Sequence, residues 1–233
     1  MLAGGQARRM GGGDKCLRQL GRRTILEQVI ERARPQVEQL VLNANGDPAR
    51  FARFGLPVAG DVIEGFAGPL AGVLTGMQWA RTHRPDCPWI ATIATDTPFL
   101  PLDLVARLSA AARDADLACA SSNGRTNPVF GLWPVALADD LRRAMTEEEV
   151  RKVDVWTARY KLSVVEFPAT PFDPFFNTNR PEDLAEAERL VQVAGGIGQK
   201  VSSIGNQYNN LFVVSTDGKT GTYKRRTYGR FAP

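Results

Sequence analysis

Glycines and cationic side chains are concentrated at the start of the chain, in L-A-G-G-Q-A-R-R-M-G-G-G-D-K from Leu2 to Lys15. A glycine backbone can bend sharply and bring its N–H groups against phosphate oxygens, and Arg8, Arg9 and Lys15 add positive charge. The segment has neither the G-K-[ST] ending of a P-loop nor the G-x-G-x-x-G of a dinucleotide fingerprint. It therefore predicts a third kind of phosphate-binding loop; the alternative is a flexible, glycine-rich segment without chemistry.

Polar side chains follow three of the predicted strands. Asp96 comes directly after the nearly continuous apolar run 89–95, Asn43 and Asn45 follow the run 39–42, and Asp61 follows 56–59. In open α/β sheets, ligands bind beyond the carboxyl ends of strands, so these side chains are expected to share one site. A carboxylate that emerges from a buried strand needs a cation, and Mg²⁺ bound to phosphates uses few protein carboxylates. Asp96 is the predicted Mg²⁺ ligand; the alternative is that Asp96-Thr97-Pro98 only caps the next helix.

The elements that must position these side chains alternate between strand and helix. Helices are expected at 24–33 with a Thr24/Glu27 capping box, at 69–80, 102–113 and 135–145, near Trp156, and from an N-cap at Asn179 with Glu182 as its reciprocal partner to about 191. Strands are expected at 39–42, 56–59, 89–95, 117–121, 129–133 and 162–167, with a polar turn at 43–48 and a loop at 123–128. This alternation predicts an α/β fold with a parallel sheet covered on both faces.

The net charge of +4 is unevenly distributed along the 233 residues. Six Lys/Arg and one acid lie from residue 199 onward, which leaves 23 basic and 24 acidic residues before it. The basic character therefore belongs to the tail alone and does not indicate the ligand of the main domain. Nucleic acid is not an expected partner, because the single cluster Lys224–Arg226 is weak evidence for such binding.

Cysteine content and hydropathy predict a reduced, cytoplasmic setting. Cys16, Cys87 and Cys119 form neither a disulfide framework nor, with the single His83, a metal-ligand spacing. No apolar run approaches the roughly 20 residues of a membrane span, and the beginning of the chain does not resemble a secretion signal. Neither export nor membrane insertion is expected.

Five motifs together resemble the molybdenum cofactor guanylyltransferases. These are the L-A-G-G-x-A-R-R-M-G-G-x-D-K loop, N-A-N at 43–45, Asp61 ahead of G-P-L-A-G at 68–72, D-T-P at 96–98, and F-x-N-x-N-x-P-E-D-L at 175–184. The resemblance runs from Leu2 to about Val191. It implies a three-layer α/β/α nucleotide-diphosphosugar transferase-like (Rossmann-like) fold with a mostly parallel central sheet. It also implies transfer of GMP from GTP to the terminal phosphate of molybdopterin.

The resemblance implies a role for each matching position. The nucleotide-binding set is Leu2, Ala3, Gly4, Gly5, Gly12, Gly13, Lys15, Asn43, Asn45, Asp61, Gly68, Pro69 and Leu70. Arg9 and Lys15 would neutralise charge on the departing pyrophosphate while Asp96 holds Mg²⁺, and Asp61 would accept guanine N1–H and N2–H. Asn177 and Asn179 would form the rear of the metal or phosphate site, although Asn179 could instead be a helix cap. By position, Arg125, Asn127, Arg151 and Lys152 face the pterin half.

This chemistry needs no side-chain base. The second pKa of a phosphate monoester is about 6, so the terminal phosphate of molybdopterin would attack as a dianion, and a missing His or Cys constellation is expected. The alternatives are a cytidylyl or sugar-nucleotide transferase of the same fold, and a non-catalytic nucleotide or pterin carrier. The expected partners are GTP, molybdopterin and, by family, molybdenum-insertion or molybdoenzyme-maturation proteins; a monomer is expected.

The chain departs from the family pattern at both ends. Family members carry apolar residues before L-A-G-G that form the first strand, whereas only Met1 precedes Leu2 here. The predicted nucleotidyltransferase domain is 1–192, with that strand nearly absent, and 193–233 is a basic extension of unknown role. This extension is expected to be disordered or hairpin-forming; a further hypothesis is that Leu211–Val214 fills the position of the first strand.

Overall fold

The fold is organised around a mixed sheet that covers the middle of the chain. The computed structural model describes residues 14–65 and 68–196, with side chains to residue 192. The strand order is β5 (Trp89–Ala91), β7 (Arg125–Pro134), β6 (Leu117–Ser122) and β8 (Leu162–Glu166). Strand β7 is antiparallel to β5 and β6, and β6 is parallel to β8, so β5, β6 and β8 all point the same way. The predicted α/β fold is confirmed, and β7 is the strand of this sheet that runs against the parallel direction.

Short strands and helices complete the described chain. The strands are β1 (Gln19–Leu20), β2 (Arg23–Thr24), β3 (Leu42–Asn43) and β4 (Val58–Ala59); β1 and β2 form an antiparallel pair and β3 and β4 a parallel one. The α-helices are α1 (Ile25–Ala33), α2 (Pro69–His83), α3 (Leu104–Ala111), α4 (Ala138–Thr146), α5 (Val153–Thr157) and α6 (Pro181–Gly196). The 3-10 helices are η1 (Lys15–Leu17), η2 (Arg34–Gln36), η3 (Pro48–Phe54), η4 (Ala112–Asp114) and η5 (Val135–Leu137).

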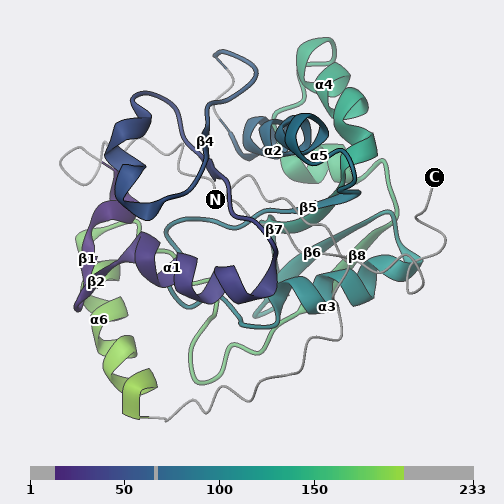
Figure 1. Cartoon of the computed structure of the whole chain (residues 1–233). Helices are drawn as coiled ribbons and strands as arrows, with labels where there is room; N and C mark the ends of the chain where they lie inside the picture. The colour runs from purple at the N-terminus through teal and green to yellow at the C-terminus, as the bar shows by residue number, and fades with distance from the viewer. Residues whose placement is uncertain (1–13, 66–67, 197–233) are drawn as a thin grey trace.

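Helices lie on both faces of the sheet and give two hydrophobic cores. In Figure 1, α2, α4 and α5 lie above the strands, while α3 lies below them. The strand side chains alternate accordingly: Trp89 and Ala91 pack into the core with α1 and α3, whereas Ile90 packs into the core with α2 and α4. The predicted coverage of both faces follows from this alternation.

The helix starts agree with the sequence signals at two places. In α1 the Thr24 side chain accepts from the Glu27 N–H and the Glu27 carboxylate accepts from the Thr24 N–H, which is the expected capping box. Helix α2 begins at Pro69, after Gly68. Both helices therefore start where their capping chemistry predicts.

The structure differs from the prediction in two segments, 123–128 and 43–48, where turn residues determine the backbone. The loop expected at 123–128 is wrong: Asn123 and Gly124 have φ of 50° and 68°, as a two-residue hairpin turn requires, and β7 starts at once at Arg125. The residues after Asn45 are not only a turn. Asp47 accepts from the Ala49 N–H at 2.9 Å and starts the 3-10 helix Pro48–Phe54.

Two element boundaries were also misplaced. The strand expected at 89–95 is regular only over Trp89–Ala91, after which the Thr92 N–H still donates to the Gly131 carbonyl at 2.9 Å. Helix α6 continues to Gly196, past its expected end at about 191. The division into 1–192 and 193–233 stays a prediction. The proposed first strand and Leu211–Val214 lie outside the described residues. Within the described ranges, no helix combines the length and apolar character needed to cross a membrane.

Candidate active site

Lys15 lies where the beginning of the chain meets the start of α6. Its Nζ donates to Oδ1 of Asn179 at 3.0 Å. The preceding residue, Asp14, pairs with Nε of Arg50 at 2.9 Å. These contacts hold the end of the glycine-rich loop against two distant elements. The predicted loop contacts Leu2, Ala3, Gly4, Gly5, Arg9, Gly12 and Gly13 lie outside the described residues.

Asp96 sits at the carboxyl side of β5, close to Lys15. The Thr178 N–H and hydroxyl donate to the Asp96 carbonyl at 3.0 and 3.1 Å, which fixes its backbone. Burial raises the pKa of the Asp96 carboxyl, and its own backbone N–H and then Lys15 act in the opposite direction. A carboxylate that is desolvated and only partly compensated is one that gains from a bound cation.

The segment before α6 carries both predicted asparagines. Asn177 Oδ1 accepts from the Thr97 hydroxyl at 2.8 Å, one residue beyond Asp96. The idea that Asn179 only caps the helix is wrong, because its side chain accepts from Lys15 instead. The predicted reciprocal partner was Glu182, but the Asp183 carboxylate accepts from the backbone N–H groups of Asn179 and Arg180, at 2.9 and 2.8 Å. The helix therefore starts one residue later than expected, and the Asn179 side chain lies against Lys15.

Asn43, Asn45 and Asp61 form a second polar group at the ends of β3 and β4. The Asn43 and Asn45 amides donate to the two Asp61 carboxylate oxygens, at 2.9 and 2.8 Å. The Asp61 N–H donates back to Asn45 Oδ1 at 2.7 Å. The predicted convergence at the carboxyl ends of neighbouring strands is confirmed for these three side chains, whereas a site shared with Asp96 stays a prediction. Because a carboxylate has about four lone-pair sites, Asp61 can still accept from a ligand.

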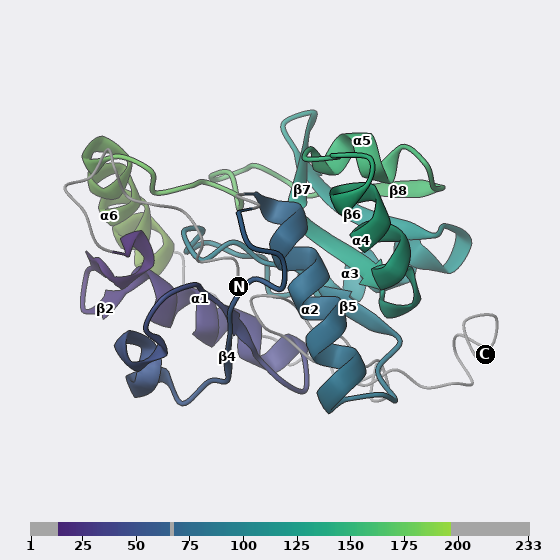
Figure 2. The same cartoon turned by 90° about the horizontal axis from the view of Figure 1, so that it is seen from above.

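The start of α2 connects this group to Arg151. Gly68 has φ of 154°, and a Cβ there would lie 3.9 Å from the Arg151 carbonyl. The guanidinium of Arg151 donates to the carbonyls of Met145 and Val150, at 2.9 and 3.3 Å. Figure 2 shows α5, which follows Lys152, beside α4 and away from α6. Arg151 therefore lies beside the Gly68 turn at the start of α2, whereas Asn177 and Asn179 immediately precede α6.

Arg125 and Asn127 lie on β7, next to the β6–β7 turn. The Asn127 amide donates to the Ser122 hydroxyl at 3.1 Å, and that hydroxyl donates to Asp173 at 2.8 Å. Asp173 belongs to the loop that continues to Asn177. The hairpin is thus joined to the loop before α6 through Asp173.

The side chains around Asp96 offer oxygen donors, the ligands that hard divalent cations prefer. No group of three His, Cys, Asp or Glu side chains lies close enough to hold a metal among the residues described. One desolvated carboxylate, Asp96, with the Thr97–Asn177 pair beside it, suits an ion that retains water and phosphate oxygens. Burial raises the pKa of the neighbouring Cys16 thiol to about 12, so it is no nucleophile at neutral pH.

Two residues were missed by the sequence reasoning. Arg50 Nη2 donates to the Asn45 carbonyl at 2.5 Å while its Nε pairs with Asp14, so it links the residue before Lys15 to the Asp61 group. Asp173 links the hairpin to the loop before α6. Nothing in the sequence distinguished Arg50 from Arg53 in P-A-R-F-A-R-F, since the contacts of Arg50 depend on the 3-10 helix.

Comparisons with known proteins define the class of protein to which the chain belongs. Residues 1–160 match the MobA-like NTP transferase domain. The structure is similar to molybdopterin-guanine dinucleotide biosynthesis protein A from Archaeoglobus fulgidus, with a TM-score of 0.63 and 25% identity over 82% of this chain and 97% of that one. The chain is a nucleotidyltransferase. The fold is shared more widely: 2-C-methyl-D-erythritol 4-phosphate cytidylyltransferase from Thermus thermophilus has a TM-score of 0.55 at 22% identity, over 78% of this chain and 95% of that one.

Sequence relatives narrow the class. The chain is 58% identical over 192 residues to the molybdenum cofactor guanylyltransferase of Rhodopseudomonas palustris strain BisB5, and 60% identical over 192 residues to that of Bradyrhizobium sp. strain ORS 278. Each match covers 82% of this chain and 91% of the relative. The chain belongs to the molybdenum cofactor guanylyltransferase family. The predicted family is confirmed, and neither a cytidylyl or sugar-nucleotide transferase nor a carrier is supported.

Proposed function

We propose that the chain transfers GMP from GTP to the terminal phosphate of molybdopterin, releasing pyrophosphate and forming the guanine dinucleotide cofactor. The observation that carries this proposal is the meeting of Lys15 and Asn179 close to Asp96. A cation and a carboxylate at adjacent strand and loop ends suit a triphosphate with its metal. The family relationship supports guanine as the base and molybdopterin as the acceptor.

In the proposed reaction, Lys15 neutralises negative charge on the departing pyrophosphate. The dianionic acceptor phosphate attacks the α-phosphorus of GTP, the bond to the bridging oxygen of pyrophosphate breaks, and no proton has to be removed. Asn179 holds Nζ of Lys15 at 3.0 Å and thereby restricts where this charge lies. Preorganised charge of this kind stabilises a transition state without reorganisation during the reaction. Arg9, Gly12 and Gly13 would contribute from the glycine-rich loop.

Asp96 would hold Mg²⁺, and Asn177 would stand beside it through Thr97. The ion would supply neutralisation and alignment of two polyanionic substrates. The desolvation of Asp96 supports this role, because burial raises the pKa of its carboxyl and the nearby Lys15 offsets only part of that effect. The carbonyl of Asp96 is fixed by Thr178, so its carboxylate is presented from a rigid backbone.

Asp61 would recognise guanine. A guanine Watson–Crick edge offers N1–H and N2–H as neighbouring donors, and a carboxylate accepts both, whereas the cytosine edge lacks this pair. Asn43 and Asn45 orient the carboxylate through its two oxygens. Gly68, Pro69 and Leu70 would close the nucleotide site from the start of α2.

The remaining assignments concern the acceptor and its setting. Arg125, Asn127, Arg151 and Lys152 would contribute to the molybdopterin half; the bonds of the Arg151 guanidinium to two carbonyls favour a supporting role for this residue. The buried thiols of Cys16, Cys87 and Cys119 form no disulfide, which suits the reduced cytoplasm. We expect a monomer that delivers its product to molybdenum-insertion or molybdoenzyme-maturation proteins, and we retain the division into 1–192 and 193–233.

The test is incubation of the full chain with GTP, Mg²⁺ and molybdopterin, measuring pyrophosphate and the guanine dinucleotide together. Equal amounts of the two products are expected, and CTP should give neither. Pyrophosphate release without dinucleotide would contradict the proposed acceptor. The same mixture with Asp96→Asn should give neither product, and unchanged product formation would contradict the metal role.

A further inference from the structure

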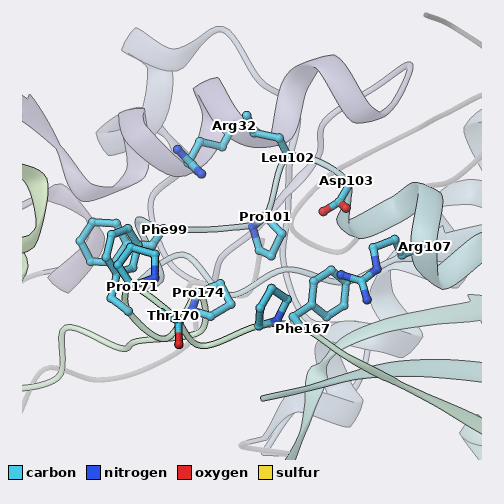
Figure 3. Close-up of a pocket in the computed structure, with 12 residues that line it drawn as sticks. Arg32, Phe99, Pro101, Leu102, Asp103, Arg107, Phe167, Thr170, Pro171 and Pro174 are labelled. Carbon is cyan, nitrogen blue, oxygen red and sulfur yellow. The ribbon is translucent and has the colours of Figure 1, made fainter. Parts of the chain in front are cut away.

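Outside the candidate active site, a cavity lies between the loop that follows Asp96 and the loop that follows β8. Its volume is about 440 Å³, within the size range of small-molecule sites. Figure 3 shows Arg32 and Asp103 projecting from one side and Phe167, Pro171 and Pro174 lining the opposite side. The cavity is thus an apolar, proline-rich pocket with charged groups at fixed places.

Hydrogen bonds from α1 and η2 hold this pocket open. Nε of Arg32 donates to the Leu100 carbonyl at 2.5 Å. Gln36 donates to the Pro101 carbonyl at 2.7 Å and accepts from the Val105 N–H at 3.0 Å. The Phe99 and Phe172 rings pack with centroids 4.7 Å apart. The walls are therefore built in advance of any ligand, which reduces the ordering cost of binding.

Arg32 is the residue of this pocket that is best placed to bind an anionic ligand. Burial lowers the pKa of its guanidinium and the charge of the adjacent Glu31 raises it, but no carboxylate within the described residues forms an ion pair with Arg32. Only Nε has a hydrogen bond to a described residue, so the two Nη groups are left for another acceptor. A partly desolvated cation without an ion-pair partner gains from an anion that joins it.

The other charges in the pocket are consistent with a single negative group on the ligand. The Arg107 guanidinium lies 4.1 Å from the Phe167 ring centroid and donates to the Glu166 carbonyl at 2.7 Å, so it is already engaged. Asp103 has no side-chain hydrogen bond to the α3 start that it precedes. Its negative charge would repel an anion, which sets a limit on affinity and gives a way to test the site.

We propose that this pocket binds a small carboxylate with a flat apolar body, the carboxylate on Arg32 and the body between Phe99, Pro101 and Phe167. The planar guanidinium fork matches a carboxylate, and the proline and phenylalanine walls match a ring. The site is separate from the Asp61 group and from Lys15. It shares one wall with the catalytic loop, because Phe99 follows Asp96-Thr97-Pro98 and its ring centroid lies 6.4 Å from that of Phe176, which precedes Asn177.

The test uses 4-fluorophenylacetate as the probe and ¹⁹F NMR of the full chain as the readout. Saturable binding with Kd of about 1 mM is expected for a ligand of this size. The uncharged analogue 4-fluorophenethyl alcohol should bind at least about tenfold more weakly, since a hydrogen bond to a charged group contributes roughly 1.5–3 kcal/mol. Equal binding of the two probes would overturn the proposal.

Three variants and one competition locate the site. Arg32→Met should raise the Kd of 4-fluorophenylacetate about tenfold. Arg34 is exposed and lies two residues further on, so Arg34→Met should leave this Kd unchanged. Asp103→Asn should lower the Kd of 4-fluorophenylacetate severalfold, because it removes a charge of the same sign as the carboxylate. If Arg32→Met melts lower than the parent, Asp103→Asn decides, and an unchanged Kd there overturns the proposal. Displacement of the probe by GTP with Mg²⁺ would also overturn it, because the probe would then occupy the nucleotide site.

Discussion

The side-chain oxygen of Asn179 lies 3.0 Å from Nζ of Lys15, across 164 positions of sequence. This contact ties the end of the glycine-rich loop to the start of α6. Asp183 holds the backbone of Asn179 in turn, at 2.9 Å. The positive charge proposed to meet the triphosphate is therefore placed by the last described helix of the chain.

Removal of this contact should reduce transfer without unfolding the protein. We expect Lys15→Met to lower kcat by roughly 100-fold or more, as for loss of one preorganised transition-state donor, and Asn179→Ala by about tenfold. The double variant should lose little more than Lys15→Met alone, because Asn179 acts through Lys15. Arg180→Ala, one residue on, is the matched control. Additive losses would mean that Asn179 contacts substrate independently.

Asp96→Asn should abolish Mg²⁺-dependent transfer while leaving the fold at least as stable as before. Burial penalises the charged carboxylate, so an uncharged amide of the same size removes that cost. The measurements are pyrophosphate release and the melting temperature of the metal-free protein at neutral pH. Mg²⁺ should raise the melting temperature of the parent in the presence of GTP and have a much smaller effect on the variant. A clearly lower melting temperature of the variant would show that Asp96 supports the fold.

Local chemistry predicted most of the fold and part of the site. The capping box at Thr24 and the Pro69 helix start depend on neighbouring residues, and both were confirmed in place. The buried strand at Trp89 was confirmed too, although it is shorter than expected. Asn43 and Asp61 could be brought together because the ends of neighbouring strands meet at one edge of a sheet.

The rest depended on contacts that no local pattern encodes. The Asn123-Gly124 turn was interpreted as part of a loop, although this dipeptide is a strong hairpin signal. Asn179 could equally have been a helix cap, and only the position of Asp183, one turn on, decides between the two roles. The contacts of Arg50 depend on the 3-10 helix Pro48–Phe54, whose sequence has only a weak helical pattern. In each case, the geometry of a turn or cap, shifted by one or two residues, determines which side chain reaches the site.

Asp140 should make the core of α4 and α5 sensitive to acid. Its carboxylate accepts from the Tyr160 hydroxyl and, at 3.1 Å, from the Trp156 indole N–H, and the Tyr160 bond is the main cause of its lowered pKa. Stabilisation from a lowered carboxyl pKa is present above the ordinary value of 3.8 and is lost as pH falls through the folded-state pKa.

Asp140→Asn should therefore lower the melting temperature at pH 7, with a loss of about 1–3 kcal/mol in the free energy of unfolding. The difference from the parent should shrink as the pH is lowered below 3.8, and a melting series against pH measures it. Asp139→Asn, on the exposed neighbour that pairs with Arg81, is the control and should change the melting temperature much less. A difference that is independent of pH would exclude the carboxylate charge as its origin.

Asp61 should determine recognition of the guanine amino group. We expect Asp61→Ala to raise KM for GTP by roughly 10-fold, since a hydrogen bond to a charged group is lost. Inosine triphosphate lacks the 2-amino group, so Asp61→Ala should reduce kcat/KM less for this nucleotide than for GTP. The ratio of kcat/KM for GTP to that for inosine triphosphate should therefore fall in the variant. Asn43→Ala should produce a smaller change of the same kind, because Asn43 orients the carboxylate. An unchanged ratio in Asp61→Ala would place guanine recognition elsewhere.

Arg50 should couple the two halves of the nucleotide site. It pairs with Asp14 beside Lys15 and binds the carbonyl of Asn45, so its loss should let both groups move relative to one another. We expect Arg50→Met to raise KM for GTP about tenfold, with part of the loss restored in Arg50→Lys, which keeps the charge but not the planar fork. Arg53→Met is the matched control on the same 3-10 helix, where the guanidinium lies over Phe54. The coupling is tested by combining Arg50→Met with Asp61→Ala, which should be less than additive in kcat/KM; strict additivity would limit Arg50 to the phosphate half.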